Sequence, residues 1–516
     1  MVGTSAEKER YETVNASKEG LVNNDANQQI INAATKNPAA SGSVSYHTMN
    51  SYFGRVFYSY ADKYMITANI RWDGSSNFAD KHRWGVFPSV SGGWNFREES
   101  FIKDVVGDWF SQGKFRAAWG EIGNQNISSG AYLTRYGNST YYLLGNSMTP
   151  WLSGGRTNVG NPDLRWETTR QLDFGLDLAF FNSALKFNID YFDRKTSDML
   201  VQVPMPAAIG LPNTPWSNAG SVKNRGFEFV LDYHGKIGND FSYNIAGNIS
   251  TYKNKVLSLG GGTNIPGKTH LGNQVNTMIE PGKPIGYFYG YKMDGVFQTQ
   301  EEINNYRGGP DNTIIMPTAE PGDLKFVDLN GDGKLGEEDR TMIGNPHPDF
   351  TFGLTLSGEY KGFDLSMFFQ GSVGNDILNI LKYDIYSGTG WYNAPKDIFD
   401  KFWTGPGSTN ENFAISANSR DNLTMSEWYI ENGSYVRLKN VTLGYTFPKQ
   451  WVQKLTVQNL RLFVAAQNLF TITSYSGLDP ELGNSNPAFM GIDMGWYPQA
   501  RSFMAVSYTH LRAHET

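Results

Sequence analysis

The chain has 516 residues, 14% of them aromatic and 18% charged, with no cysteine and a formal net charge of −6. The lack of cysteine excludes disulfides, thiol catalysis and Cys-ligated zinc or iron–sulfur centres, and an acidic balance without a basic run argues against nucleic-acid binding. No stretch approaches the roughly 18 consecutive apolar residues of a membrane helix, which excludes an α-helical membrane protein but leaves a β-barrel possible.

The first segment, residues 1–44, is polar and lacks a clear period, so we expect an extracellular loop or a partial segment there. The first ten residues also lack the apolar core of a signal peptide. Either the chain is cytosolic or its true start lies upstream, and the strand count below favours an upstream start.

From about residue 45 onward, large apolar side chains alternate with small or polar ones, as in a strand with two different faces. Every even position from Leu172 to Phe180 is large and apolar, for example, and the odd positions between them are small or acidic. The period predicts about 13 strands, near 46–60, 63–74, 84–97, 109–120, 165–180, 184–199, 222–236, 240–256, 348–360, 362–374, 433–447, 456–472 and 497–508.

The connections between these strands alternate in length. Short turns at 61–62, 181–183, 237–239 and 361 alternate with long polar loops at 121–164, 200–221, 257–347, 375–432 and 473–496. Strands of about 12 to 18 residues exceed the usual length in globular sheets, and aromatic residues gather at their ends, as in a transmembrane barrel with short periplasmic turns and long extracellular loops. A soluble all-β protein, such as a sandwich, is the alternative. An odd strand number does not close a bacterial barrel, so we expect the sequence to be incomplete.

Several segments resemble the SusC/RagA family of TonB-dependent outer-membrane transporters. Individually each motif is weak, but together they cover nearly all of residues 50–505. They are Tyr64–Phe78, Trp84–Trp94, Asn161–Glu167, Asp190–Leu200, Asn224–Glu228, Pro284–Tyr291, Gly322–Lys334 and Tyr435–Tyr445.

The resemblance implies an all-β transmembrane antiparallel barrel of about 22 strands with an N-terminal plug. Residues 45–508 would form its C-terminal part, with 257–347 as a long extracellular loop, and the plug would be absent from this chain. After Val506 the alternation breaks, so residues 509–516 are expected to be a non-native tail outside the fold.

The same resemblance implies a function and its partners. Family members import oligosaccharides or peptides across the outer membrane of Gram-negative bacteria, with a SusD-like surface lipoprotein as a lid and energy from TonB–ExbB–ExbD through the plug. No cofactor is required. The alternatives are a different TonB-dependent receptor, for a siderophore or cobalamin, and a β-rich surface binding protein or adhesin. Catalytic motifs such as G-x-S-x-G, H-E-x-x-H and the P-loop are absent, so we do not expect an enzyme.

Residues 328–339 match the D-x-[DN]-x-[DN]-G pattern of a calcium loop. Side-chain oxygens stand at positions 1, 3 and 5, a backbone carbonyl at 7 and an acid at 12. The candidate ligands of a structural Ca²⁺ are Asp328, Asn330, Asp332, Lys334 and Asp339. A plain Asx-rich turn that satisfies its own backbone is the alternative.

Two sets of residues are candidates for contact with cargo. Loop aromatics could stack on sugar rings or hold a peptide, or simply pack the loops; they are Tyr132, Tyr136, Tyr141, Tyr142, Trp151, Trp391 and Tyr392. Strand parity predicts a lumen-facing set, namely Arg71, Asp173, Asp177, Asn188, Asp190, Glu228 and Asp232. Arg437 and Lys439 share one face of a late strand and are expected to pair with such acids.

Overall fold

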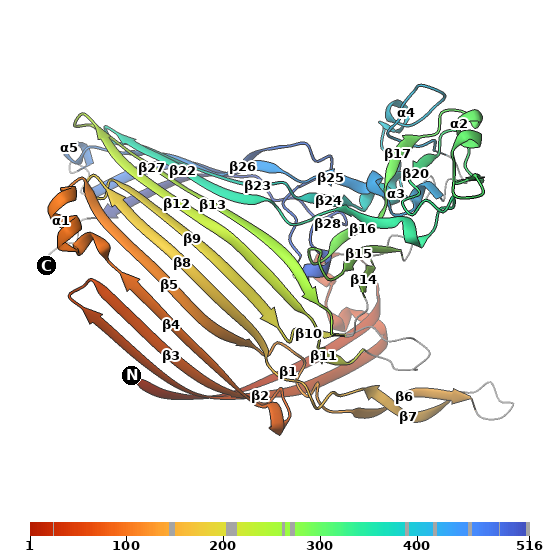
Figure 1. Cartoon of the computed structure of the whole chain (residues 1–516), viewed down its shortest axis with the longest axis horizontal. Coiled ribbons are helices and arrows are strands. Elements are labelled where there is room, and N and C mark those ends of the chain that lie inside the picture. The colour runs from red at the N-terminus through yellow and green to blue at the C-terminus, as the bar shows by residue number, and fades with distance from the viewer. Residues whose placement is uncertain are drawn as a thin grey trace.

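A single antiparallel sheet of 14 strands dominates the computed structural model (Figure 1). The structure describes residues 1–23, 25–143, 150–202, 214–260, 264–268, 274–386, 392–415, 421–452, 457–484 and 486–511. The strands, in spatial order, are β1 (Val2–Leu21), β2 (Ala34–Tyr60), β3 (Tyr64–Ser75), β4 (Trp84–Trp94), β5 (Phe110–Asn124), β8 (Glu167–Phe180), β9 (Leu185–Ser197), β12 (Ser221–Ile237), β13 (Phe241–Ser258), β22 (Phe350–Tyr360), β23 (Phe363–Val373), β26 (Tyr435–Thr446), β27 (Val457–Thr473) and β29 (Ser502–Leu511).

Each predicted strand overlaps a strand of this sheet, but the expectation of a loop at residues 1–44 is wrong, and the described sheet has 14 strands, an even number, where about 13 were expected. Residues 2–21 form β1, and β2 already begins at Ala34. The two strands pair along nearly their whole length, from Val2 opposite Gly54 to Leu21 opposite Ala34. Their side chains are mostly exposed, so backbone pairing rather than burial of an alternating face defines this hairpin, and the apolar period could not reveal it.

The C-terminal end also differs from the expectation. β29 continues past Val506 to Leu511 and pairs with β27, with Thr509 opposite Leu460. Residues 509–511 therefore belong to the sheet, because ladder hydrogen bonds need no apolar alternation; residues 512–516 lie outside the described part of the chain.

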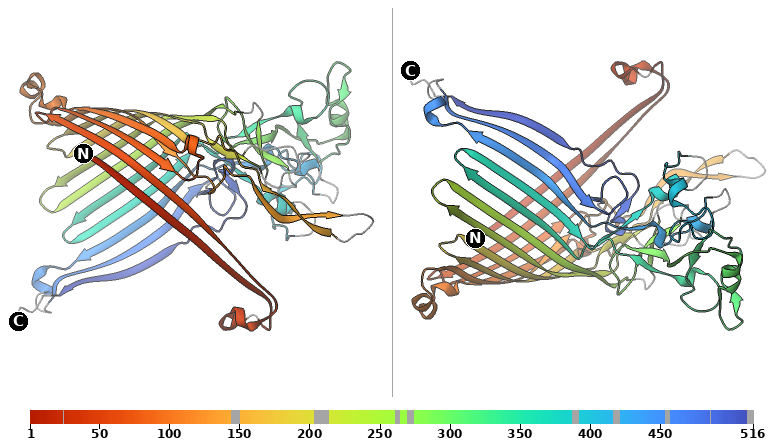
Figure 2. Two further views of the ribbon diagram at one scale, coloured as in Figure 1. Left: turned by 90° about the horizontal axis from the view of Figure 1, so that it is seen from below. Right: turned by 90° about the horizontal axis from the view of Figure 1, so that it is seen from above.

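The sheet curls, and its connections separate by length into two ends. Turns at 61–63, 181–184, 238–240 and 361–362 lie at one end, together with the connections that contain α1 (Ser100–Val106) and α5 (Lys449–Val452). The long connections lie at the other end. Figure 2 shows the strands slanting across the curl, the β1–β2 hairpin projecting beyond it, and both chain termini at the short-turn end.

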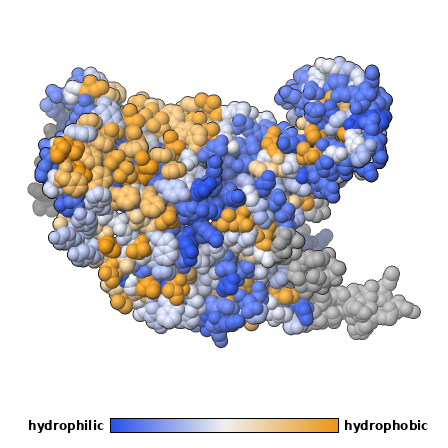
Figure 3. Space-filling view, in the orientation of Figure 1, coloured by the Kyte–Doolittle hydropathy of each residue, from blue (hydrophilic) through white to orange (hydrophobic). Residues whose placement is uncertain are grey.

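The register gives the sheet one apolar and one polar face. On the apolar face, large apolar side chains of neighbouring strands lie side by side across the sheet, for example Phe174 beside Tyr191 and Tyr191 beside Phe227. Many of these side chains are exposed, such as Ile70 at 54% and Val464 at 55%. Figure 3 shows the apolar surface gathered over the half of the sheet away from the long connections. Monomeric soluble proteins rarely expose so extended an apolar patch.

The long connections fold into a unit with its own core. We call it the loop unit, made of the described residues of 275–344, 376–432 and 475–493. Its buried core includes Phe288, Phe297, Phe326, Tyr429 and Ile492. Its strands and helices, with the neighbouring β14, are β14 (Ile265–Lys268), β15 (Val275–Ile279), β16 (Tyr287–Tyr291), β17 (Met293–Val296), α2 (Gln300–Asn305), β18 (Arg307–Gly308), β19 (Thr313–Ile314), β20 (Leu324–Phe326), β21 (Arg340–Gly344), β24 (Asp376–Asn379), α3 (Leu381–Tyr386), α4 (Ile398–Lys401), β25 (Ile430–Asn432) and β28 (Ile492–Asp493).

Two smaller pairs complete the long-connection end. A hairpin of β6 (Arg135–Leu143) and β7 (Pro150–Asn158) projects from it, and β10 (Leu200–Gln202) pairs with β11 (Trp216–Asn218). A small second core of Phe78, Phe87, Leu164 and Trp166 lies beneath these segments. Within the described ranges, no helix has both the length and the apolar character that crossing a membrane requires.

Candidate functional site

The polar face of the sheet carries the strand residues predicted from parity. The register places all seven opposite the apolar face: Arg71, Asp173, Asp177, Asn188, Asp190, Glu228 and Asp232. Asp190 lies directly beside Glu228, and Asp232 beside Lys186. That these residues line the lumen of a closed barrel stays a prediction.

Arg116, which the sequence analysis missed, is the centre of a charged cluster on this face. It donates two hydrogen bonds of 2.8 Å to the carboxylate of Asp177 and lies 2.8 Å from Asp190. Asn188 donates to the same Asp177 carboxylate at 2.7 Å. Gly175 makes room for this arrangement, since a Cβ there would lie 2.4 Å from an Asp190 oxygen and 2.6 Å from the Arg116 guanidinium carbon. Two carboxylates thus share one guanidinium, which leaves the cluster net negative.

Arg71 makes a second, simpler contact on the polar face. Its Nε donates to both oxygens of Asp73, at 2.8 and 2.7 Å, and its Nη2 donates to Ser51 Oγ at 3.0 Å. Asp73 and Ser51 are buried. The predicted Arg71 therefore fixes neighbouring strands as well as presenting charge.

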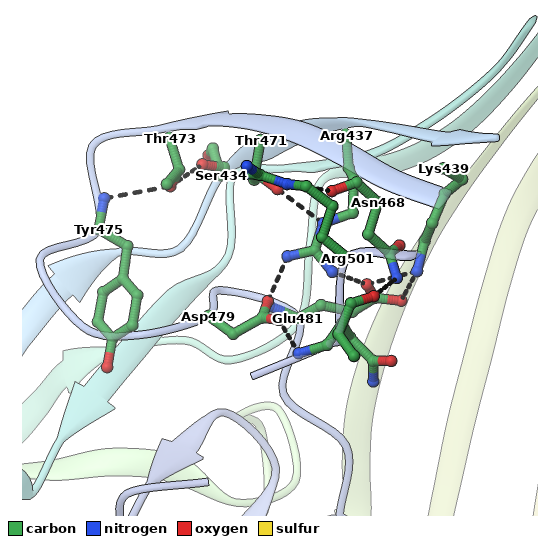
Figure 4. A network of polar contacts seen from close by, with 12 residues as sticks. Ser434, Arg437, Lys439, Asn468, Thr471, Thr473, Tyr475, Asp479, Glu481 and Arg501 are labelled. Carbon is green, nitrogen blue, oxygen red and sulfur yellow. Dashed lines mark hydrogen bonds and ion pairs between the residues drawn. The ribbon is translucent and has the colours of Figure 1, made fainter. Parts of the chain in front are cut away.

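A third cluster attaches the connection 474–501 to the polar face (Figure 4). Arg437 Nη2 donates to Asp479 at 2.5 Å, its Nη1 to Glu481 at 2.7 Å and its Nε to Thr471 at 2.7 Å. Lys439 Nζ reaches Glu481 at 2.6 Å. We call these five residues the Arg437 network. Pairing of Arg437 and Lys439 with acids of the strands was expected, but their partners belong to the connection instead, because it folds back over the wall.

Burial and charge act in opposite directions on Asp479. Burial raises the pKa of its carboxyl. The hydrogen bonds from Arg437 and from the backbone amides of Gln499 and Glu481 lower it by more than burial raises it, so the net pKa is below its usual value. Asp479 is therefore ionised at neutral pH, which is the state that the network requires.

The predicted loop aromatics do not form one described cluster. Tyr136 and Tyr392 are exposed, whereas Tyr132 is half-buried. The side chains of Tyr141, Tyr142 and Trp151 lie outside the described part of the structure, as does the whole of Trp391. Sequence reasoning missed Tyr497, which is 92% exposed beside Trp496 on the connection held by the Arg437 network. Two adjacent aromatics in a long polar loop were the available signal.

The calcium-like loop satisfies its own backbone. Asp328 accepts from the amides of Gly331 and Gly333 at 2.7 and 2.8 Å, and buried Asp339 accepts from three amides, among them Gly336 at 2.7 Å. Asn330 and Asp332 cap the amides of Asp332 and Lys334. Gly331 and Gly333 adopt positive φ angles of 74° and 82°.

The loop combines a satisfied backbone with oxygen atoms that remain able to accept a cation. Across the described residues, no group of three or more His, Cys, Asp or Glu is placed to hold a metal, but a calcium loop also uses amide and carbonyl oxygens. A carboxylate has about four acceptor sites, so the turns leave lone pairs for a cation. Calcium binding stays a prediction.

Comparison with known proteins identifies this architecture. The family profile described as "TonB dependent receptor-like, beta-barrel" matches residues 8–469. The chain belongs to the TonB-dependent receptor β-barrel family. It is 35% identical to TonB-dependent receptor P3 of Formosa agariphila over 97% of this chain and 49% of that protein. It is 32% identical to TonB-dependent receptor SusC of Bacteroides thetaiotaomicron over 89% of this chain and 43% of that protein.

Solved structures show the same fold. The structure titled "Structure of the RagAB peptide transporter" matches with a TM-score of 0.80 at 22% identity, over 98% of this chain and 53% of that chain. This TonB-dependent receptor barrel thus spans about half the length of the curated relatives it matches.

Membership of the family gives the two faces of the sheet their environments. The barrel is an outer-membrane receptor of the SusC/RagA type, and its relatives are receptors rather than enzymes. Its exposed apolar face therefore meets lipid, and the short-turn end faces the periplasm while the long connections face outward. The loop unit and the Arg437 network consequently belong to the extracellular end.

Proposed function

We propose that this receptor imports oligosaccharides or peptides across the outer membrane, in an energised cycle that depends on TonB and on a SusD-like lipoprotein lid. The observation that carries the proposal is the similarity to SusC over 89% of the chain. The RagAB structure, titled as a peptide transporter, shares the fold.

The described residues support a polar cargo. The wall of the barrel presents Asp190, Glu228 and Asp232 on neighbouring strands, with Arg116 and Lys186 among them. Such a surface offers hydrogen bonds to hydroxyl or amide groups and little to an apolar ligand. At the outward end, the loop unit has a packed core of its own, and a preformed surface of that kind suits the docking of a lid protein.

The test is uptake by cells that carry or lack the gene. We expect a deletion strain to lose growth on one oligosaccharide or peptide from a panel, and the complete gene product to restore it. Restoration should disappear when TonB is removed or the proton-motive force is collapsed. Uptake that persists without TonB would instead show a passive pore and would refute the proposal.

The partner is tested separately. Affinity purification of the complete gene product from membranes should recover a SusD-like lipoprotein in equal amount. Purification of the receptor alone, in a detergent that preserves such complexes in a RagAB-type control, would contradict the lid.

A further inference from the structure

The lipid-facing surface is hollowed near its periplasmic end. The hollow lies over β13, β22, β23 and β26, has a volume of about 480 Å³ and is almost wholly apolar, within the size range of small-molecule sites. Its walls and floor include Phe241, Tyr243, Leu356, Gly358, Phe363 and Leu365.

Two glycines create this hollow. Gly358 has no side chain to cover the floor, and a Cβ there would lie 3.3 Å from the Phe241 ring. Gly235, on β12 at the far side of β13, makes room for the ring of Tyr243, which a Cβ would meet at 2.6 Å. Tyr243 therefore leans toward Gly235 and leaves the surface above Gly358 open. Neither glycine has a positive φ, so backbone conformation does not explain the residue type at either position.

The walls of the hollow are braced by aromatic contacts. Phe241 stacks on Tyr243 with ring centroids 5.9 Å apart, and the Tyr243 hydroxyl donates to the Tyr233 hydroxyl at 3.3 Å. On the opposite side Phe363 packs on Tyr445 at 4.5 Å. A cavity with fixed walls loses little side-chain entropy when a ligand enters.

A polar recess continues the hollow toward the periplasm. It shares Phe241, Tyr360, Phe363 and Asp364 with the hollow. Beyond them it is lined by the turn residues 239–240 and 361–362 and by Lys236, Ser242, Glu359 and Thr446. Lys361 Nζ lies 5.3 Å from the Tyr360 ring centre and 3.5 Å from an Asp240 oxygen. Both charged side chains are more than half exposed, so each can still bind a ligand group.

We propose that the hollow and this recess form a binding site for one phosphatidylethanolamine molecule of the periplasmic leaflet. An acyl chain occupies the floor at Gly358, because that floor lies in the hydrocarbon region and is lined by apolar groups, which suit a hydrocarbon chain. The headgroup carries one phosphate and one ammonium, which match the opposite charges of Lys361 and Asp240. An anionic phospholipid lacks the ammonium and therefore offers no cationic group to the Asp240 carboxylate.

The test measures lipid that stays bound to the complete gene product. The purified receptor is washed with detergent, supplied with equimolar phosphatidylethanolamine and phosphatidylglycerol, and examined by native mass spectrometry. We expect one phosphatidylethanolamine per receptor. Gly358→Leu fills the floor and displaces about two methylene groups of the chain, which should lower affinity about tenfold. Asp240→Asn should abolish the preference between the two lipids, because Asp240 is the partner of the ammonium that only phosphatidylethanolamine carries.

A glycine on the same face provides the matched control. Gly247 lies on β13 outside the hollow, and a Cβ there would meet its nearest neighbours at an ordinary 3.7 Å. Gly247→Leu should therefore retain lipid like the wild type. Heat-modifiable gel migration checks that each variant is folded, and Leu365→Trp, which fills the hollow from the neighbouring strand, replaces Gly358→Leu if that variant does not fold. Equal retention in a folded, filled variant, or a preference for phosphatidylglycerol, would overturn the proposal.

Discussion

Replacing Arg437 with methionine should release the connection 474–501 from the barrel wall. Only 4% of the Arg437 side chain and 6% of the Asp479 side chain is exposed. Removal of one partner from a buried ion pair costs about 3–5 kcal/mol, because the other charge is left uncompensated. Asp479 would keep the backbone amides of Glu481 and Gln499, and Glu481 would keep Lys439. We therefore expect the lower end, about 3 kcal/mol, or roughly a 100-fold increase in local opening.

Hydrogen exchange on the complete gene product measures this opening directly. Amides of 474–501 should exchange roughly 100-fold faster in Arg437→Met while those of β8 and β9 stay unchanged. Arg165→Met is the control, since its ion pair with Asp198 has 56% and 38% of the side chains exposed and contributes less than about 1 kcal/mol. If Arg437→Met increased exchange no more than this control, the argument that burial strengthens the network would be refuted.

The Arg437 network also has a defined pH dependence. The pKa of Asp479 is lower in the folded state than in the unfolded chain, so its stabilisation is fully present above the unfolded value of about 3.9 and disappears as pH falls through the folded value. The protection factors of the 474–501 amides, that is, their exchange rates corrected for the pH dependence of exchange in an unfolded chain, should stay constant from pH 8 to about pH 5. A network that opens already between pH 7 and 6 would contradict this assignment.

Three further outcomes follow from the structure. Ile249→Arg on the lipid-facing side of β13 should cost about 2–4 kcal/mol and reduce heat-modifiable, assembled receptor, whereas Asn248→Arg on the polar side should be tolerated; equal effects would refute the register. Asp339→Ala leaves three amides without their acceptor and should destabilise the loop unit by about 1–3 kcal/mol with or without calcium. Asp332→Ala frees only the exposed Lys334 amide, which water can satisfy, so it should lower Ca²⁺ binding with little loss of stability; a calorimetric titration with no heat at millimolar Ca²⁺ would remove the calcium prediction. Burial lowers the pKa of His347, although its bond to the Ile285 carbonyl opposes the shift; stability should therefore fall as pH drops below about 6.5, and thermal unfolding of His347→Gln should lose that slope.

Much of the sheet could be predicted from the sequence because one face meets lipid. Burial of one face in hydrocarbon enforces a strict two-residue period, and β8, for example, was predicted within two residues at its first end. The β1–β2 hairpin escaped because most of its side chains are exposed and only backbone pairing specifies it.

The candidate site was predicted only in part, since parity identifies a face but not a partner. Asp177 and Asp190 were assigned to the correct side of the sheet, but nothing local indicates that Arg116, on a strand more than 60 residues earlier, bridges them. Arg437 was likewise identified from its place on a strand. Its partner Asp479 was not, because Asp479 lies in a connection that shows no apolar period. In the same way, nothing local in the sequence indicates that Phe288 and Tyr429 share a core, because that core forms only from distant segments.

The loop unit imposes an order on folding. Its contacts join residues far apart in the chain, as when its Met425 amide donates to the side chain of Gln274, the residue just before its first segment, across 151 positions. Such closures are entropically costly unless intervening segments are already held together. The β22–β23 hairpin begins and ends between these residues, so its insertion brings them close before they pair. The extracellular surface is therefore completed late, and an antibody against its folded form would report whether the strands beneath it had assembled.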